Sequence, residues 1–140
     1  NPAATELLAL NIEHLNTRRK NEQGGQASPL DPAELHCRDA LDWSKDSKNH
    51  GKIDLLLVNL PHQSIHHLET LLPLLKRNQT SVLRGWAIVD KAHLIESEQT
   101  IHRTISEASG TLEKFSFKEI KGFSTTKRFM CFEAWLNLSA

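Results

Sequence analysis

The 140-residue sequence lacks the features that mark disulfide-rich, metal-knuckle, membrane-spanning or strongly charged proteins. Its two cysteines, Cys37 and Cys131, lie far apart and form no C-x-x-C pair, so neither a zinc knuckle nor a disulfide framework is predicted. Both fall in predicted strands, where we expect buried, inert thiols. No apolar run approaches the roughly 20 residues of a membrane-spanning helix, and no signal-peptide pattern opens the chain. A reducing intracellular compartment fits best, with the cytoplasm expected and the nucleus or mitochondrion as alternatives.

The chain also lacks net charge, since Lys plus Arg and Asp plus Glu number 17 each. No overall field therefore attracts nucleic acid or a membrane surface. The balance is uneven in one segment, residues 114–128, where five basic residues stand against the single acid Glu119. This segment is either a phosphate-facing patch or, as is more usual for such a run, a solvated strand face.

The most informative stretch is an apolar run at residues 53–58 that ends in Asn59-Leu60-Pro61. Such a run between polar turns is typical of a strand buried on both faces, as in a parallel sheet covered by helices. Ligands bind outside the carboxyl ends of such strands, where the side chain of Asn59 offers one acceptor and two donors. Because Asn and Pro are also ordinary turn residues, a plain strand-ending turn is the alternative.

The rest of the chain alternates between helical and strand patterns. Helices are predicted at 2–22, 62–75 and 93–109, and a helical turn at 40–43. Strands are predicted at 33–38, 81–89, 112–123 and 128–138, with a loop at 23–29. Pro73 is expected to kink or shorten its helix, and Gly85 indicates a bulge or a close approach by another group. This alternation, ended by a hairpin, predicts an α/β domain whose parallel sheet has an antiparallel edge.

Two groups of side chains have competing interpretations. His62, His66 and His67 fall on a predicted helix, where positions i and i+4 share a face, but there is no H-E-x-x-H pattern and no obvious third ligand, so no metal site is predicted. Trp86 is predicted to lie on a strand at the edge of the ligand site. Core packing is its default role, and stacking on a nucleic-acid base is the alternative.

Three segments together resemble the tRNA guanine-N1 methyltransferases and the related wybutosine-synthesis transferases, which have the class I S-adenosylmethionine-dependent methyltransferase fold. Asn1-Pro2 with the following Leu7, Leu10, Asn11, Ile12 and Asn16 is similar to that family's "LNP…L..NI..N" helix. Residues 54–61 are similar to its "D-x-V-x-x-N-L-P" strand, and residues 121–132 to its closing hairpin. The resemblance implies a Rossmann-like sheet over residues 1–140, as the C-terminal part of a methyltransferase domain.

The resemblance implies S-adenosylmethionine as cofactor and tRNA as partner, with methyl transfer to N1 of the guanosine beside the anticodon. Asp39 and Ala40 would meet the cofactor's adenine, while Asn59 and Leu60 would lie near the methyl donor. Asn59 and Pro61 are the catalytic candidates: Asn59 would orient the target base, and Pro61 would shape the pocket. The candidates for RNA contact are Arg84, Lys121, Lys127 and Arg128.

The chain departs from this family in two respects that bear on activity. The family's glycine-rich cofactor turn is missing, and no G-x-G pattern occurs in the sequence. The first two strands of the fold are missing as well, so we expect them from a longer form of the same protein or from another chain. Without them, the predicted strand at 33–38 has no neighbour to link it to the strand at 53–58. Whether the chain is an enzyme by itself is therefore open. The alternatives are a non-catalytic binding module that keeps the fold, and a methyltransferase of the same fold that acts on another RNA or on a protein.

Overall fold

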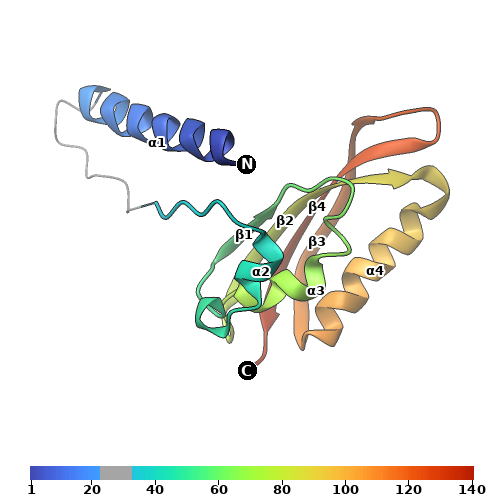
Figure 1. Cartoon of the computed structure of the whole chain (residues 1–140). Coiled ribbons are helices and arrows are strands. Elements are labelled where there is room, and N and C mark those ends of the chain that lie inside the picture. Colours follow the sequence, from blue (N-terminus) through green and yellow to red (C-terminus); the bar gives the residue numbers. More distant parts are fainter. Residues whose placement is uncertain (23–32) are drawn as a thin grey trace. The chain divides into compact units, whose positions relative to one another are not determined.

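The computed structural model describes residues 1–22 and 33–140, which form two compact units, residues 1–39 and 40–140 (Figure 1). In the first unit, α1 (Pro2–Glu22) confirms the predicted helix, but none of its residues is buried, and Leu7 and Leu10 are largely exposed. Residues 33–39 form no strand, so the strand predicted at 33–38 is wrong, and Cys37 is exposed rather than buried. The loop predicted at 23–29 lies outside the described residues.

The second unit is built on a four-stranded mixed sheet in the order β1-β2-β4-β3. Strand β1 (Leu55–Val58) runs parallel to β2 (Thr80–Asp90). The strands β3 (Gly110–Gly122) and β4 (Lys127–Leu138) form a hairpin, and β4 pairs antiparallel with β2 over the whole length of that strand. The predicted α/β sheet with an antiparallel edge is thus confirmed.

Helices precede β1 and connect the strands, and α4 is the longest of them in residues 40–140 (Figure 1). They are α2 (Ala40–Ser44), η1 (Ser47–Asn49), α3 (Leu68–Leu71), η2 (Leu72–Leu74), η3 (Lys91–His93) and α4 (Leu94–Glu107). The helix predicted at 62–75 is wrong over its first half, because residues 61–67 form turns and the helix begins at Leu68. Pro73 shortens it as predicted, since the chain changes there to a 3-10 turn.

The core lies between one face of the sheet and the helices α3 and α4. Every second residue of β2 is buried there, and Phe132 of β4 is fully buried among Leu68, Leu83 and Ile101. The ring of Phe132 lies against Gly85, where a Cβ added to the glycine would be only 2.2 Å from the ring's Cζ. The close approach predicted at Gly85 is therefore made by Phe132.

Within residues 40–140, the opposite face of the sheet is left open at β1. On β1, Leu56 and Val58 face the core, whereas Leu55 and Leu57 are 52% and 56% exposed. The expectation that this strand is buried on both faces is wrong. A continuous apolar run indicates two covered faces, but here none of the described residues of the second unit covers Leu55 and Leu57, and β1 forms the edge of the sheet.

Candidate functional site

The candidate site begins where β1 ends, at the turn of residues 59–64. The backbone N–H of Gln63 and that of Ser64 both donate to the carbonyl of Leu60, at 2.7 and 2.8 Å. In return, the N–H of Leu60 donates to Oγ of the fully buried Ser64, at 3.2 Å. The carbonyl of Pro61 accepts from the N–H of Ile88 on β2, at 2.8 Å. These bonds fix the turn to the sheet and account for its non-helical path.

Asn59 is the first residue of this turn, and its side chain is exposed. The carboxamide makes no hydrogen bond to any residue that the structure describes, so both its donor and its acceptor groups are available to a ligand. Residues 59–63 line a shallow cavity of about 260 Å³. Leu60, 44% exposed, gives this cavity an apolar wall.

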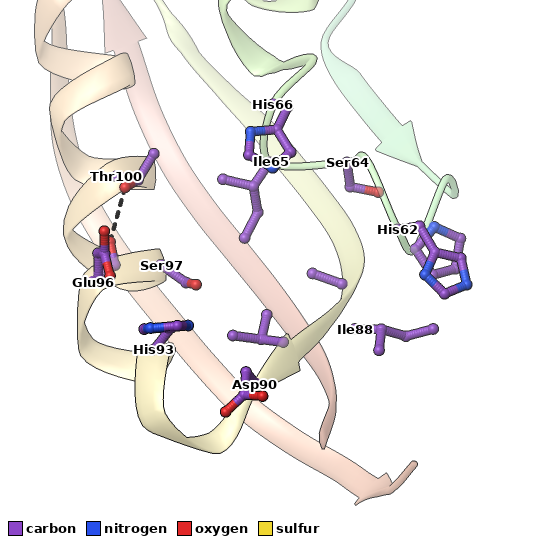
Figure 2. Close-up of a pocket in the computed structure, with 13 residues that line it drawn as sticks. His62, Ser64, Ile65, His66, Ile88, Asp90, His93, Glu96, Ser97 and Thr100 are labelled. Carbon is purple, nitrogen blue, oxygen red and sulfur yellow. Dashed lines mark hydrogen bonds between the residues drawn. The ribbon is translucent and has the colours of Figure 1, made fainter. Parts of the chain in front are cut away.

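A second cavity, of about 360 Å³, lies on the other side of the same turn (Figure 2). Its walls are the turn itself, the end of β2 and the first turns of α4. His93 projects from the end of η3, Glu96 and Ser97 project from α4, and Ile65 and His66 line the opposite wall. Pro61 and His62 line both cavities, so this short segment separates two spaces of ligand size.

His62 also contacts the hairpin that closes the sheet. Its ring lies 6.2 Å from that of Phe123, centroid to centroid, with an interplanar angle of 83°. The three histidines considered for a metal do not share a helix, because residues 61–67 form turns. Within residues 1–22 and 33–140, no group of three His, Cys, Asp or Glu side chains is placed to hold a metal ion.

Asp54, the acid of the predicted strand motif, lies at the other end of β1 from Asn59. Its carboxylate accepts from the ammonium of Lys76 at 2.9 Å and from the amide of Gln79 at 2.9 Å. The Lys76 bond holds the pKa of Asp54 below its ordinary value, and the bond from Gln79 adds to this. The position and bonds of this acid indicate a structural role, because it ties β1 to the segment that leads into β2.

The structure places the predicted cofactor residues in two groups. Asn59, Leu60 and Pro61 lie together in the turn. Asp39 is the last residue of the first unit, and Ala40 begins α2 in the second.

The predicted RNA contacts fall on two parts of the sheet. Arg84 lies on the open face, where its Nε donates to Glu133 at 2.6 Å. Arg128 lies in the hairpin and pairs with Glu119 at 3.2 Å. Lys121 and Lys127 are exposed on the same hairpin, and neither forms an ion pair within the described residues.

Sequence reasoning missed several of these features. The contact of His62 with Phe123 joins residues far apart in the sequence, and the second cavity depends on α4 packing beside the turn. Neither has a local sequence signal. The hydrogen bond from the N–H of Leu60 to Oγ of Ser64 spans only four residues. It was not predicted because the same stretch has the apolar spacing of a helix.

Comparison with known proteins gives similarity of structure without close similarity of sequence. No protein-family model and no curated protein sequence matches the chain. The solved structure of M. jannaschii TYW2 in complex with AdoMet has a TM-score of 0.66 at 14% identity, covering 99% of this chain and 55% of that one. The M. jannaschii tRNA m1G37 methyltransferase has a TM-score of 0.56 at 14% identity, covering 99% and 34%.

A complex of aTrm5 with tRNALeu has a TM-score of 0.53 at 15% identity, covering 98% of this chain and 33% of that one. The chain thus spans about half or less of the length of these proteins. No helix in the described part of the chain is both long and apolar enough to cross a membrane. The chain has the fold of the class I methyltransferases, and it is similar in structure to TYW2 and to tRNA m1G37 methyltransferases.

Proposed function

We propose that this chain carries the acceptor side of an S-adenosylmethionine-dependent methyltransferase that methylates N1 of a tRNA guanosine beside the anticodon. The observation that supports this most is the Asn59-Leu60-Pro61 turn, held open to ligands at the carboxyl end of β1. It occurs in a fold similar to that of a TYW2 structure that contains AdoMet and to that of a tRNA m1G37 methyltransferase.

The residues of the turn fit a cofactor that has polar groups and must meet a planar base. The unpaired carboxamide of Asn59 can both donate and accept, and Leu60 presents an apolar surface beside it. In this proposal Asn59 and Leu60 lie near the methyl donor, while Asp39 and Ala40 hold its adenine. The cofactor supplies an electrophilic methyl group bound to sulfur.

The chain's own residues would act mainly by positioning. Asn59 would hydrogen-bond the edge of the guanine, and its N1 would then be aligned for in-line attack on the methyl carbon. Pro61, with its carbonyl bonded to Ile88, fixes the distance between the turn and the sheet. Loss of the N1 proton requires an acceptor, and a carboxamide such as that of Asn59 is not basic enough. The acceptor must therefore be another group.

The cofactor-binding half must come from elsewhere. We propose that strands carrying a glycine-rich turn are supplied by a longer form of the protein or by another chain. The free edge of β1 supports this, since Leu55 and Leu57 leave an apolar face there that a neighbouring strand with its helix would cover.

For the RNA partner, the proposal assigns backbone contacts to Lys121 and Lys127, which are free to pair with phosphates. Arg84 and Arg128 would contribute after exchanging or sharing their carboxylate partners, Glu133 and Glu119.

The absence of a glycine-rich turn favours a second candidate function, a binding module that keeps the fold without catalysis.

Calorimetric titration with S-adenosylhomocysteine tests the assignment of the cofactor half, after circular dichroism shows that the chain is folded. We expect weak or undetectable binding by the 140-residue chain, and binding once the upstream sequence is restored. Asn59→Ala in the restored protein should keep cofactor binding within about tenfold while lowering methyl transfer by about 100-fold, or roughly 2.7 kcal/mol of transition-state stabilisation. Tight binding by the 140-residue chain alone would overturn the division into halves.

A further inference from the structure

An exposed aromatic side chain lies beside the candidate site. Phe123 follows β3 directly and is 52% exposed. Its contact with His62 is edge to face rather than stacked. Burying this side chain in contact with another flat group would remove apolar surface from water, and aromatic rings prefer offset-stacked or edge-to-face partners.

The backbone around Phe123 is firmly held. Its N–H donates to the carbonyl of Lys127 at 3.0 Å, and the N–H of Lys127 donates to Oγ of Ser124 at 3.1 Å. The turn is also tied to the end of β2, because the N–H of Lys91 donates to the carbonyl of Thr126 at 2.8 Å. A side chain on a backbone ordered in advance loses little conformational freedom when a ligand binds.

The segment that carries Phe123 is basic in sequence, and the acid nearest to it in the sheet register is Asp90 of β2, opposite Lys127. Glu119 is the only acid between positions 114 and 128, and Arg128 already pairs with it at 3.2 Å. The ammonium of Lys121 lies 5.9 Å from the centre of the Phe129 ring, without a carboxylate partner among the described residues. Lys127 is likewise exposed. Phe123 is thus an exposed aromatic residue flanked in the sequence by two lysines without ion-pair partners among the described residues. Proteins combine aromatic rings with nearby cations to bind unpaired nucleotides, whose bases stack while their phosphates pair.

We propose that Phe123, supported by His62, is a stacking site for an unpaired nucleobase of an RNA loop, with Lys121 and Lys127 pairing with its phosphates. The proposal rests on the function proposed above and adds to it the residue that holds an unstacked base next to the Asn59 turn. Charge favours this occupant over an apolar protein segment, because such a segment would leave both lysines without a partner.

The test is a fluorescence titration of the 140-residue chain into an RNA hairpin whose loop contains 2-aminopurine, a base that loses fluorescence when it stacks. No cofactor is needed, so the result does not depend on methyl transfer. We expect quenching with the wild-type chain and with Phe123→Trp. Phe123→Leu keeps an apolar side chain but has no ring. It should bind roughly 5- to 150-fold more weakly, which corresponds to the stacking contribution of one base.

Ile120→Ala provides a matched control, since Ile120 is 55% exposed on β3, three residues before Phe123, and has no ring. This variant should quench and bind like the wild type. Because Phe123 and Ile120 are exposed, both variants should unfold at the wild-type temperature. Binding by Phe123→Leu equal to that of the wild type would overturn the proposal. So would a folded wild-type chain that causes no quenching. Quenching by the 140-residue chain, together with no binding of S-adenosylhomocysteine by the folded protein with its upstream sequence restored, would leave the stacking site in place and count against the methyltransferase proposal alone.

Discussion

Replacement of Gly85 by alanine tests the packing of the sheet most sharply. The new Cβ would lie 2.2 Å from Cζ of Phe132 and 2.8 Å from each of its Cε atoms. Carbon atoms pack at about 3.5–4.0 Å, so the ring would have to move by more than about 1 Å. The ring is fully buried, and its movement must displace further core side chains. Overpacking of this kind costs about 1–3 kcal/mol.

The lower entropy of the unfolded chain returns about 0.4–1 kcal/mol when glycine becomes alanine. A net loss of about 1.3 kcal/mol is therefore expected for Gly85→Ala. For a domain of this size that corresponds to a fall in melting temperature of roughly 4–5 °C. Urea unfolding followed by tryptophan fluorescence, with a thermal melt in parallel, measures both quantities.

Two further variants connect this loss to the ring. At Gly122 a Cβ would meet only Nη1 of Arg128, at an ordinary 3.8 Å. Gly122→Ala should thus change stability by no more than about 0.5 kcal/mol. Phe132→Leu combined with Gly85→Ala should cost less than the sum of the two single changes, by at least about 0.5 kcal/mol. Wild-type stability of Gly85→Ala, or strict additivity in the double variant, would refute this account of the core.

Two other predictions concern the turn and the open face. Ser64→Ala should cost about 1–3 kcal/mol in urea unfolding, because it leaves the N–H of Leu60 without its buried acceptor; an unchanged midpoint would show that the turn does not need this bond. Hydrogen bonds from Trp135 and then Arg84 hold the pKa of Glu133 below its ordinary value. Its carboxylate therefore stabilises the fold above the ordinary glutamate pKa, and this contribution is lost as the pH falls below about 4. Glu133→Gln should be less stable than the wild type by under about 1 kcal/mol at neutral pH, and this difference should shrink in acid. A difference that is constant with pH would contradict the assignment.

The parts of the fold that could be predicted are those with strong local signals. The strand at 81–89 and the final hairpin have apolar patterns bounded by turn residues, and the structure forms them within a residue or two of the predicted bounds. Gly85 could be recognised because a glycine inside a strand has few reasons other than close packing.

The predictions that were wrong concern segments whose structure depends on contacts with other parts of the protein. Residues 33–38 contain none of the β-branched or aromatic residues that favour strands. A strand also exists only when another strand completes its hydrogen bonds, and no described residue does so. The leucines of β1 predicted two buried faces, yet burial is a property of what covers a sheet and not of the run itself. In the stretch 62–67, the helical spacing of apolar residues was outweighed by specific bonds from Ser64 and Ile88 to the turn.

In the candidate site too, features with a local sequence signal could be predicted, and features that depend on contacts distant in the sequence could not. The exposed turn at Asn59-Leu60-Pro61 could be located from the sequence, since an apolar run ending in Asn and Pro marks the carboxyl end of a strand. The partners of that turn could not be located. Phe123 and the first turns of α4 reach it only through the pairing of the hairpin and the packing of the helix.

The central claim is that the Asn59 turn positions a guanosine for methyl transfer. The most direct measurement is transfer of a radiolabelled methyl group from S-adenosylmethionine to a tRNA transcript, using the protein with its upstream sequence restored. The account predicts label in N1-methylguanosine after nuclease digestion. It further predicts about 100-fold less label with Asn59→Ala, and none when the guanosine beside the anticodon is replaced by adenosine. Undiminished transfer by Asn59→Ala, or no transfer by a folded protein that binds S-adenosylhomocysteine, would contradict it.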